Sequence, residues 1–219
     1  MDTDPAIASR DKPASYYQLE RSDLVAELPT PIGRALDVGC GEGGVGRSLR
    51  AAGATEVHGV ELFESAAVRA RESLDSVISG SVEEALASGA LHGPFDTICC
   101  YDVLEHLVDP HRVLVALRDL AATGGRLHIS IPNARHFSLI LDLVFRGTFG
   151  YREWGHRDST HLRWYTRRDL MALVESAGWR VEWTRSPAFA GLDRYLDRAT
   201  LGTTREFNTL QWHLLAHRR

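Results

Sequence analysis

The chain has few cysteines, a single lysine and no long apolar run, and these shortages exclude whole classes of protein. Its 219 residues include three cysteines, Cys40, Cys99 and Cys100, and no C-x-x-C pair. A disulfide framework and a structural zinc site are therefore not expected. No apolar run approaches a membrane span, and the polar N-terminus has no apolar signal region. We therefore expect a cytoplasmic protein.

Net charge is also small. The chain carries 25 basic and 29 acidic side chains, a formal charge of -4, and its basic residues are almost all arginine. This balance gives no indication of general nucleic-acid binding. With 44% hydrophobic residues, the chain is long enough for one α/β domain with a full core.

The most informative stretch is Ala35–Leu49, with the sequence ALDVGCGEGGVGRSL. A short apolar run containing Asp37 breaks into four glycines within six residues, and helix-forming residues follow. This pattern predicts a buried strand, a tight turn and a helix start. Glycines permit positive φ and close ligand approach, and the helix N-terminus offers free N–H groups. We expect a polar or anionic ligand on this turn.

Two ligand families match the spacing. Gly39, Gly41 and Gly44 fit the dinucleotide pattern G-x-G-x-x-G, with Glu61 near the place of a ribose-binding acid. Asp37 and the following glycines also fit D-x-G-x-G-x-G, and here the chain resembles the class I S-adenosylmethionine (SAM)-dependent methyltransferases. A carboxylate buried in a strand is costly without a partner, and the ammonium group of SAM is one. An NAD-dependent oxidoreductase is the first rival.

The resemblance continues in DVLEHL, which starts at Asp102, and in a helix–GG–strand–PN order that ends at Asn133. It covers Tyr16 to the C-terminus. The chain is similar in particular to ubiquinone-biosynthesis O-methyltransferases and to methyltransferases of bacterial glycan and natural-product pathways. It implies a Rossmann-like α/β fold: a seven-stranded, mostly parallel sheet with an antiparallel last strand and helices on both faces.

The resemblance also suggests a division of one domain into four parts. These are an N-terminal tail and lid helix (1–33), a SAM-binding core (34–132), a substrate-capping insert (133–165) and a C-terminal helix with two strands (166–219). The expected strands are 35–38, 56–61, 77–80, 95–101, 126–131, 179–183 and 207–217. The expected helices include 16–28, 64–73, 110–120 and 166–177.

In the resembled family, Glu61 accepts hydrogen bonds from the ribose hydroxyls, and an aspartate often binds adenine where this chain has Ser81. The N-terminal helix often covers the cofactor. The full set of cofactor-binding residues that the resemblance implies is Tyr17, Asp37, Gly39, Cys40, Gly41, Gly43, Glu61, Leu62, Ser81, Val82, Tyr101, Asp102 and Val103.

Methyl transfer depends on close alignment, and a hydroxyl acceptor also benefits from a general base. The candidate bases are His106, His156 and His161, with Asp102, Glu105 and Asp158 as acid partners. His106 ranks first because it follows the fourth strand, and the alternative is a packed histidine. The leading hypothesis is O-methylation of a small-molecule acceptor. N-methylation and a non-catalytic SAM-binding subunit remain open.

Asp102, Glu105 and His106 also form D-x-x-E-H, which His161 can complete as a divalent metal site. Methyltransferases that modify RNA ends at the 2′-oxygen build a metal site from a similar E-x-x-E-H run. A metal-dependent RNA enzyme is thus a further alternative, although this chain lacks the basic stripe. We assign no metal from the sequence.

The insert begins with an apolar run at Phe137–Phe145 and continues with glycine, arginine and aromatic residues. A lid packed on the sheet is the favoured interpretation. The alternative is an amphipathic lip that touches lipid through residues 137–151, because the insert of the resembled quinone enzymes is associated with membranes. Whether the protein is a monomer or a homodimer stays open.

Overall fold

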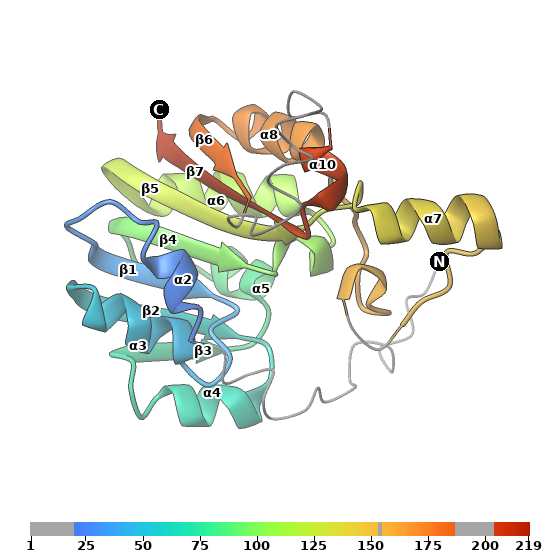
Figure 1. Cartoon of the computed structure of the whole chain (residues 1–219). Coiled ribbons are helices and arrows are strands. Elements are labelled where there is room, and N and C mark those ends of the chain that lie inside the picture. The colour runs from blue at the N-terminus through green and yellow to red at the C-terminus, as the bar shows by residue number, and fades with distance from the viewer. Residues whose placement is uncertain (1–19, 153–154, 187–203) are drawn as a thin grey trace.

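The computed structural model describes residues 20–152, 155–186 and 204–219. A seven-stranded sheet has the order β3-β2-β1-β4-β5-β7-β6, with helices on both faces (Figure 1). Only β7 runs antiparallel to its neighbours, β5 and β6. The expected fold class is therefore confirmed. A classical dinucleotide-binding sheet would have a parallel strand where β7 lies.

The strands are β1 (Gly33–Val38), β2 (Ala54–Glu61), β3 (Ser76–Ser79), β4 (Phe95–Tyr101), β5 (Ala121–Pro132), β6 (Trp179–Arg185) and β7 (Gln211–Arg218). The helices are α2 (Ser22–Val25), α3 (Gly44–Ala51), α4 (Glu64–Ala70), α5 (Val82–Ala87), α6 (Pro110–Leu120), α7 (Phe137–Arg146), α8 (Arg167–Ser176) and α10 (Arg205–Asn208), with 3-10 turns η1 (Leu104–His106) and η2 (Gly155–Arg157).

Local sequence signals set several of these boundaries. Helix α6 starts with Pro110 at its first position, and Asp109 accepts a hydrogen bond from Arg112 N–H. Helix α8 has the predicted capping box between Thr166 and Asp169. Such caps satisfy N–H groups that no helical carbonyl can reach. The termini of these helices are thus specified by their own residues.

The sheet separates two apolar clusters. The adjacent Cys99 and Cys100 lie in different clusters, as expected for neighbours on a strand, and both are free thiols. The larger cluster holds Trp179, whose indole N–H donates to the carbonyl of Leu114. The strands are therefore buried on both faces, as parallel strands covered by helices should be.

Several element predictions were wrong at their ends. The expected helix 16–28 is, in its described part, only Ser22–Val25, and Tyr17 lies outside the described residues. Strand β5 begins at Ala121, not at residue 126, because Thr123–Gly125 form an irregularity within the strand rather than a helix stop. The expected last strand loses its first residues to α10, which contains Phe207.

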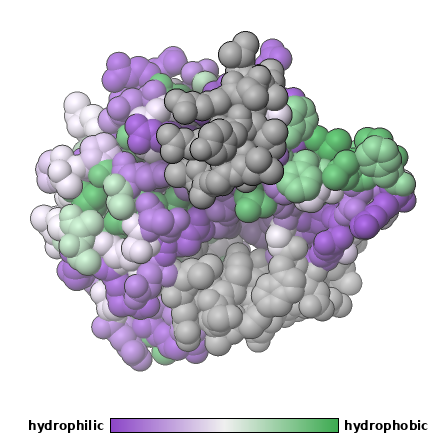
Figure 2. Space-filling model, in the orientation of Figure 1, coloured by the Kyte–Doolittle hydropathy of each residue, from purple (hydrophilic) through white to green (hydrophobic). Residues whose placement is uncertain are grey.

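Helix α7 corrects the expectation of a lid packed on the sheet. The helix projects from the body, and only Leu139 of its residues is buried (Figure 1). Phe137, Leu141, Val144 and Phe145 form an exposed apolar face, visible in green in Figure 2. No helix in the described ranges has the length and apolarity to cross a membrane. The insert thus offers an apolar helix face to its surroundings.

Candidate active site

The glycine turn after β1 has the predicted geometry. Gly39, Gly41 and Gly43 have φ angles of 73°, 53° and 82°, which disfavour any residue with a side chain. A Cβ on Gly39 would also lie 2.8 Å from a methyl carbon of Val103. Val103, from the segment after β4, therefore packs directly against the turn. The backbone N–H groups and the start of α3 face the same edge of the sheet as the end of β4.

Asp37 and Glu61 place two buried acids beside this turn. Asp37 is 1% exposed, and its Oδ2 has no hydrogen-bond partner among the described residues. Burial, followed by the charge of Glu61, raises the pKa of Asp37 to about 8. Glu61 accepts hydrogen bonds from Gly41 N–H at 2.9 Å and from Phe63 N–H at 3.0 Å. An unpartnered buried carboxylate oxygen fits a cationic group such as the ammonium of SAM.

The other predicted cofactor residues divide into two groups. Cys40 and Val82 are buried near the turn and α5, whereas Leu62 is 54% exposed. Ser81 accepts a hydrogen bond from Glu84 N–H at 3.1 Å and so caps α5. Burial raises the pKa of the Cys40 thiol, which therefore stays protonated. Their contact with the cofactor stays a prediction.

Tyr101 belongs to a buried polar network that no local sequence pattern predicts. Its hydroxyl lies 2.8 Å from Nδ1 of His128, and Nε2 of His128 lies 3.6 Å from Glu27. Glu27 also contacts Nδ1 of His213 at 3.0 Å. These residues are 27 to 186 positions apart, so no local motif connects them.

Asp102 is at the end of β4, with a positive φ of 55°. Its Oδ2 accepts from Arg21 at 2.8 Å, and its Oδ1 accepts from the amide of Gln211 at 2.7 Å. These contacts hold its carboxylate in an ion pair between the N-terminal segment and β7. Asp102 is thus not part of the histidine cluster below, contrary to its expected role as a histidine's acid partner.

Of the four residues in the D-x-x-E-H interpretation, Glu105, His106 and His161 come together, whereas Asp102 does not join them. One ligand atom from each lies within 4.8 Å of the others, and the two histidine rings are 4.8 Å apart. Nε2 of His161 is 3.9 Å from Glu105 Oε1. The insert reaches this place because Leu162 and Arg163 donate backbone N–H groups to the Glu105 carbonyl at 2.8 and 3.1 Å.

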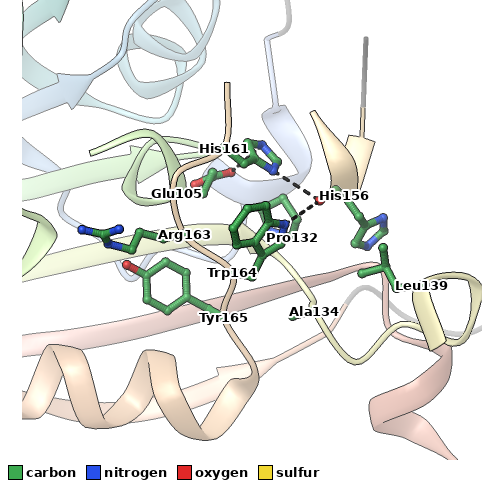
Figure 3. Close-up of a pocket in the computed structure, with 9 residues that line it drawn as sticks. All are labelled: Glu105, Pro132, Ala134, Leu139, His156, His161, Arg163, Trp164 and Tyr165. Carbon is green, nitrogen blue, oxygen red and sulfur yellow. Dashed lines mark hydrogen bonds and ion pairs between the residues drawn. The ribbon is translucent and has the colours of Figure 1, made fainter. Parts of the chain in front are cut away.

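His156 does not join the cluster. Its Nε2 donates to the Leu210 carbonyl at 2.9 Å, and its ring stacks on His136 at 5.0 Å. Burial lowers the pKa of His156. Its carbonyl, however, accepts from Trp164 and lies 3.4 Å from Nδ1 of His161 (Figure 3). His156 therefore contacts the cluster through its backbone carbonyl, and its action as a base stays a prediction.

A small, partly open hollow adjoins the cluster (Figure 3). Its walls are Glu105, Pro132, Ala134, Leu139, His156, His161, Arg163, Trp164 and Tyr165. One side is apolar, and the other has the Glu105–His161 pair. The Tyr165 hydroxyl is buried without a hydrogen-bond partner among the described residues, and burial raises its pKa to about 12. It therefore remains a hydrogen-bond donor at neutral pH.

Comparison with known proteins decides the family. A methyltransferase domain model matches residues 13–183. This chain belongs to that family. It is 28% identical over 235 residues to a ubiquinone biosynthesis O-methyltransferase of Xanthomonas axonopodis pv. citri, with 97% of this chain and 92% of the relative covered. It is 38% identical over 134 residues to the enzyme of that name in Aromatoleum aromaticum, covering 54% and 56%.

The first relatives matched are thus covered over about half of their length. The fold agrees with a solved SAM-dependent methyltransferase from Mesorhizobium loti, with a TM-score of 0.63, 19% identity, and coverage of 91% of this chain and 97% of the other. Family and fold imply SAM as the cofactor, and the orphaned oxygen of Asp37 fits it. They also decide against the oxidoreductase alternative.

Proposed function

We propose that this methyltransferase-family chain transfers a methyl group from SAM to a hydroxyl oxygen of a small-molecule acceptor. The proposal is supported mainly by the position of two groups of residues at the same edge of the sheet. Asp37, with its unpartnered Oδ2, and the Glu105–His106–His161 cluster both lie near the carboxyl ends of the parallel strands β1 and β4. Ligands of open α/β sheets collect at this edge. Cofactor and acceptor groups would therefore meet there.

In this proposal Asp37 holds the ammonium group of SAM, and Glu61 exchanges its backbone hydrogen bonds for the ribose hydroxyls. SAM supplies the electrophilic methyl group. Nε2 of His106 would accept the proton of the acceptor hydroxyl as that oxygen takes up the methyl group, which would leave S-adenosylhomocysteine. A positioned base and a close, aligned acceptor are two established sources of rate.

The acceptor we propose is an aromatic or quinone-like hydroxyl compound, as in quinone, glycan or secondary-metabolite pathways. The relatives' names support it, since they include ubiquinone biosynthesis O-methyltransferases. The lining of the hollow supports it as well, because Pro132, Leu139 and Trp164 offer apolar side chains beside Glu105 and His161. An amine acceptor would need no base, and then His106 would be dispensable.

A metal-assisted version is the second candidate, favoured by the mutual approach of Glu105, His106 and His161. An acid and two imidazoles suit a divalent cation, which would lower the pKa of a bound hydroxyl. Chelation followed by readdition of Mg²⁺, Mn²⁺ or Zn²⁺ separates the two versions. Loss and recovery of activity support the metal, and activity unaffected by chelation excludes it.

We also propose that α7 contacts a lipid surface. Its outer face is apolar, and its other face is fixed by Asp142, which is ion-paired with Arg146, Arg152 and Arg157. The side chains of Arg146 and Arg152 are 72% and 61% exposed next to the apolar face. Apolar residues flanked by arginine suit an anionic interface.

The test of the proposed function combines binding with turnover. Calorimetry should show SAM and S-adenosylhomocysteine binding and no NAD binding. Acceptors with phenolic hydroxyls, with amines and with neither are then incubated with methyl-labelled SAM, and the products are identified by mass spectrometry. We expect O-methyl products. Methylated amines alone, or tight SAM binding without transfer to any acceptor, would overturn the proposal and favour the N-methyl or non-catalytic alternative.

A further inference from the structure

His106 receives its orientation from the insert, 54 residues further along the chain. Its Nδ1 lies 3.1 Å from Oγ1 of Thr160 and 3.2 Å from the Thr160 carbonyl oxygen. Thr160 itself is held by Asp158, whose Oδ1 accepts from the Thr160 hydroxyl at 2.7 Å and from its N–H at 2.9 Å. Asp158 is buried. One residue thus links a fixed acid to the imidazole ring.

The direction of these hydrogen bonds follows from the groups involved. A carboxylate oxygen only accepts, so the Thr160 hydroxyl proton goes to Asp158. A carbonyl oxygen also only accepts, so Nδ1 of His106 must carry the proton that it shares with Thr160. In the neutral ring, Nε2 then carries the lone pair. The ring meets His161 edge to face, on the side of the cluster.

We propose that Thr160 is a positioning residue, which fixes the ring orientation and the Nδ1–H tautomer of His106 so that the lone pair of the neutral ring lies on Nε2. The inference rests on the proposed function, since it gives Nε2 a use there. It holds whether Nε2 accepts a proton or binds a cation, because both need the lone pair on that atom. Thr160 of the insert thereby orients His106 of the SAM-binding core.

The first test is a nitrogen NMR spectrum of the histidine rings in the protein without ligands. The spectrum of His106, assigned by its loss in His106→Ala, should show a protonated Nδ1 and an unprotonated Nε2. A ring protonated at Nε2 alone would overturn the proposal. This measurement needs no acceptor, so it remains decisive even if the chain methylates none of the compounds offered.

The second test is turnover. Thr160→Val keeps the β-branched shape but removes the hydroxyl, and should lower kcat about 10-fold, while SAM affinity stays as in the wild type. Thr160→Ser should restore most of the rate. Thr148→Val is the matched control, because this exposed threonine of the same insert accepts only a local hydrogen bond from Gly150 N–H. It should leave kcat unchanged.

A double-mutant cycle separates positioning from a general structural role. In a His106→Ala background, measured with labelled SAM for sensitivity, Thr160→Val should cause no further loss of kcat, because the ring that it orients is gone. If the 10-fold loss persists in that background, or if Thr160→Ser fails to restore the rate while folding normally, the proposal is wrong.

Discussion

The cofactor side and the acceptor side of this molecule are built in different ways. On the cofactor side, Asp37 and three positive-φ glycines follow one another within a few residues, and the β1–β2 pairing brings in Glu61. On the acceptor side, Glu105 and His106 meet His161 from an insert more than fifty residues away. The first is set by local backbone geometry, and the second depends on how a long insert folds back.

This difference indicates which parts of the site can change their residues and which cannot. A turn that needs glycine at positive φ tolerates few substitutions, whereas loops carried on a scaffold can change their side chains freely. The cofactor is therefore implied by family and fold, while the acceptor remains a proposal. Four predictions test whether the two sides are separable.

The largest effect is expected from Asp37→Asn. The change removes a buried acid whose Oδ2 has no hydrogen-bond partner among the described residues, so the protein without cofactor should become more stable, with a higher Tm. SAM affinity should fall about 100-fold, or about 2.7 kcal/mol, because the ammonium loses its counter-charge. Thermal melting with and without SAM checks both results. Unchanged stabilisation by SAM would mean that Asp37 does not face the cofactor.

His106→Ala should affect the acceptor side alone, so that turnover falls while SAM affinity is unchanged. Removing the base should lower kcat about 100- to 1000-fold, within the range for a positioned proton acceptor. His111→Ala is the matched control, since that histidine is exposed on α6 and lies outside the cluster. It should retain most of the rate. Equal losses of kcat in both variants would show that the Glu105–His106–His161 cluster is not the site of the reaction.

The protonation of Asp37 should be visible in the pH dependence of both folding stability and SAM binding. Its pKa in the folded protein without ligand is raised from 3.8 to about 8, so at pH 7 it holds a proton that the unfolded chain has released. Stability contributed by this group therefore falls as pH rises from about 4 to 8, with a slope of up to about 1.4 kcal/mol per pH unit.

Binding of the SAM ammonium requires the ionised form of Asp37, and SAM should therefore release a proton below pH 8. Calorimetry in two buffers of different ionisation enthalpy measures that proton, and Asp37→Asn supplies the baseline. Equal proton release by wild type and variant would assign it to another group.

The smallest effect on turnover in solution is expected from the apolar face of α7. Val144→Asp with Phe145→Asp changes side chains that are 65% and 77% exposed, so Tm and SAM affinity should hold. Binding to vesicles of phosphatidylglycerol should be lost in a sedimentation assay. Val108→Asp is the control, because Val108 is 70% exposed away from the helix. Vesicle binding that survives the double change would contradict lipid contact through α7.

Much of the fold could be predicted from sequence because its signals are local. Apolar strands, the glycine turn, Pro110 and the Thr166 capping box each specify their own segment. The errors fell where tertiary contacts override local preference. Gly124 and Gly125 resemble a helix stop, yet they lie within β5, where its pairing with β4 is irregular. A Cβ on Gly125 would lie 2.9 Å from the Phe95 carbonyl oxygen.

The candidate site was predictable in part for the same reason. The approach of His161 to Glu105 and His106 followed from their residue types, but the ion pair of Asp102 with Arg21 spans 81 positions. Nothing near Asp102 in the sequence indicates it. The support of His106 by Thr160 is equally remote, since a threonine in a loop has many uses.

We propose that cofactor binding and proton transfer belong to separate residues that meet at one edge of the sheet. The most direct test is a calorimetric titration of SAM into wild type, Asp37→Asn and His106→Ala under identical conditions. We expect wild-type SAM affinity for His106→Ala and a loss of about 100-fold for Asp37→Asn. Equal weakening of both variants, or full affinity in Asp37→Asn, would contradict the proposal.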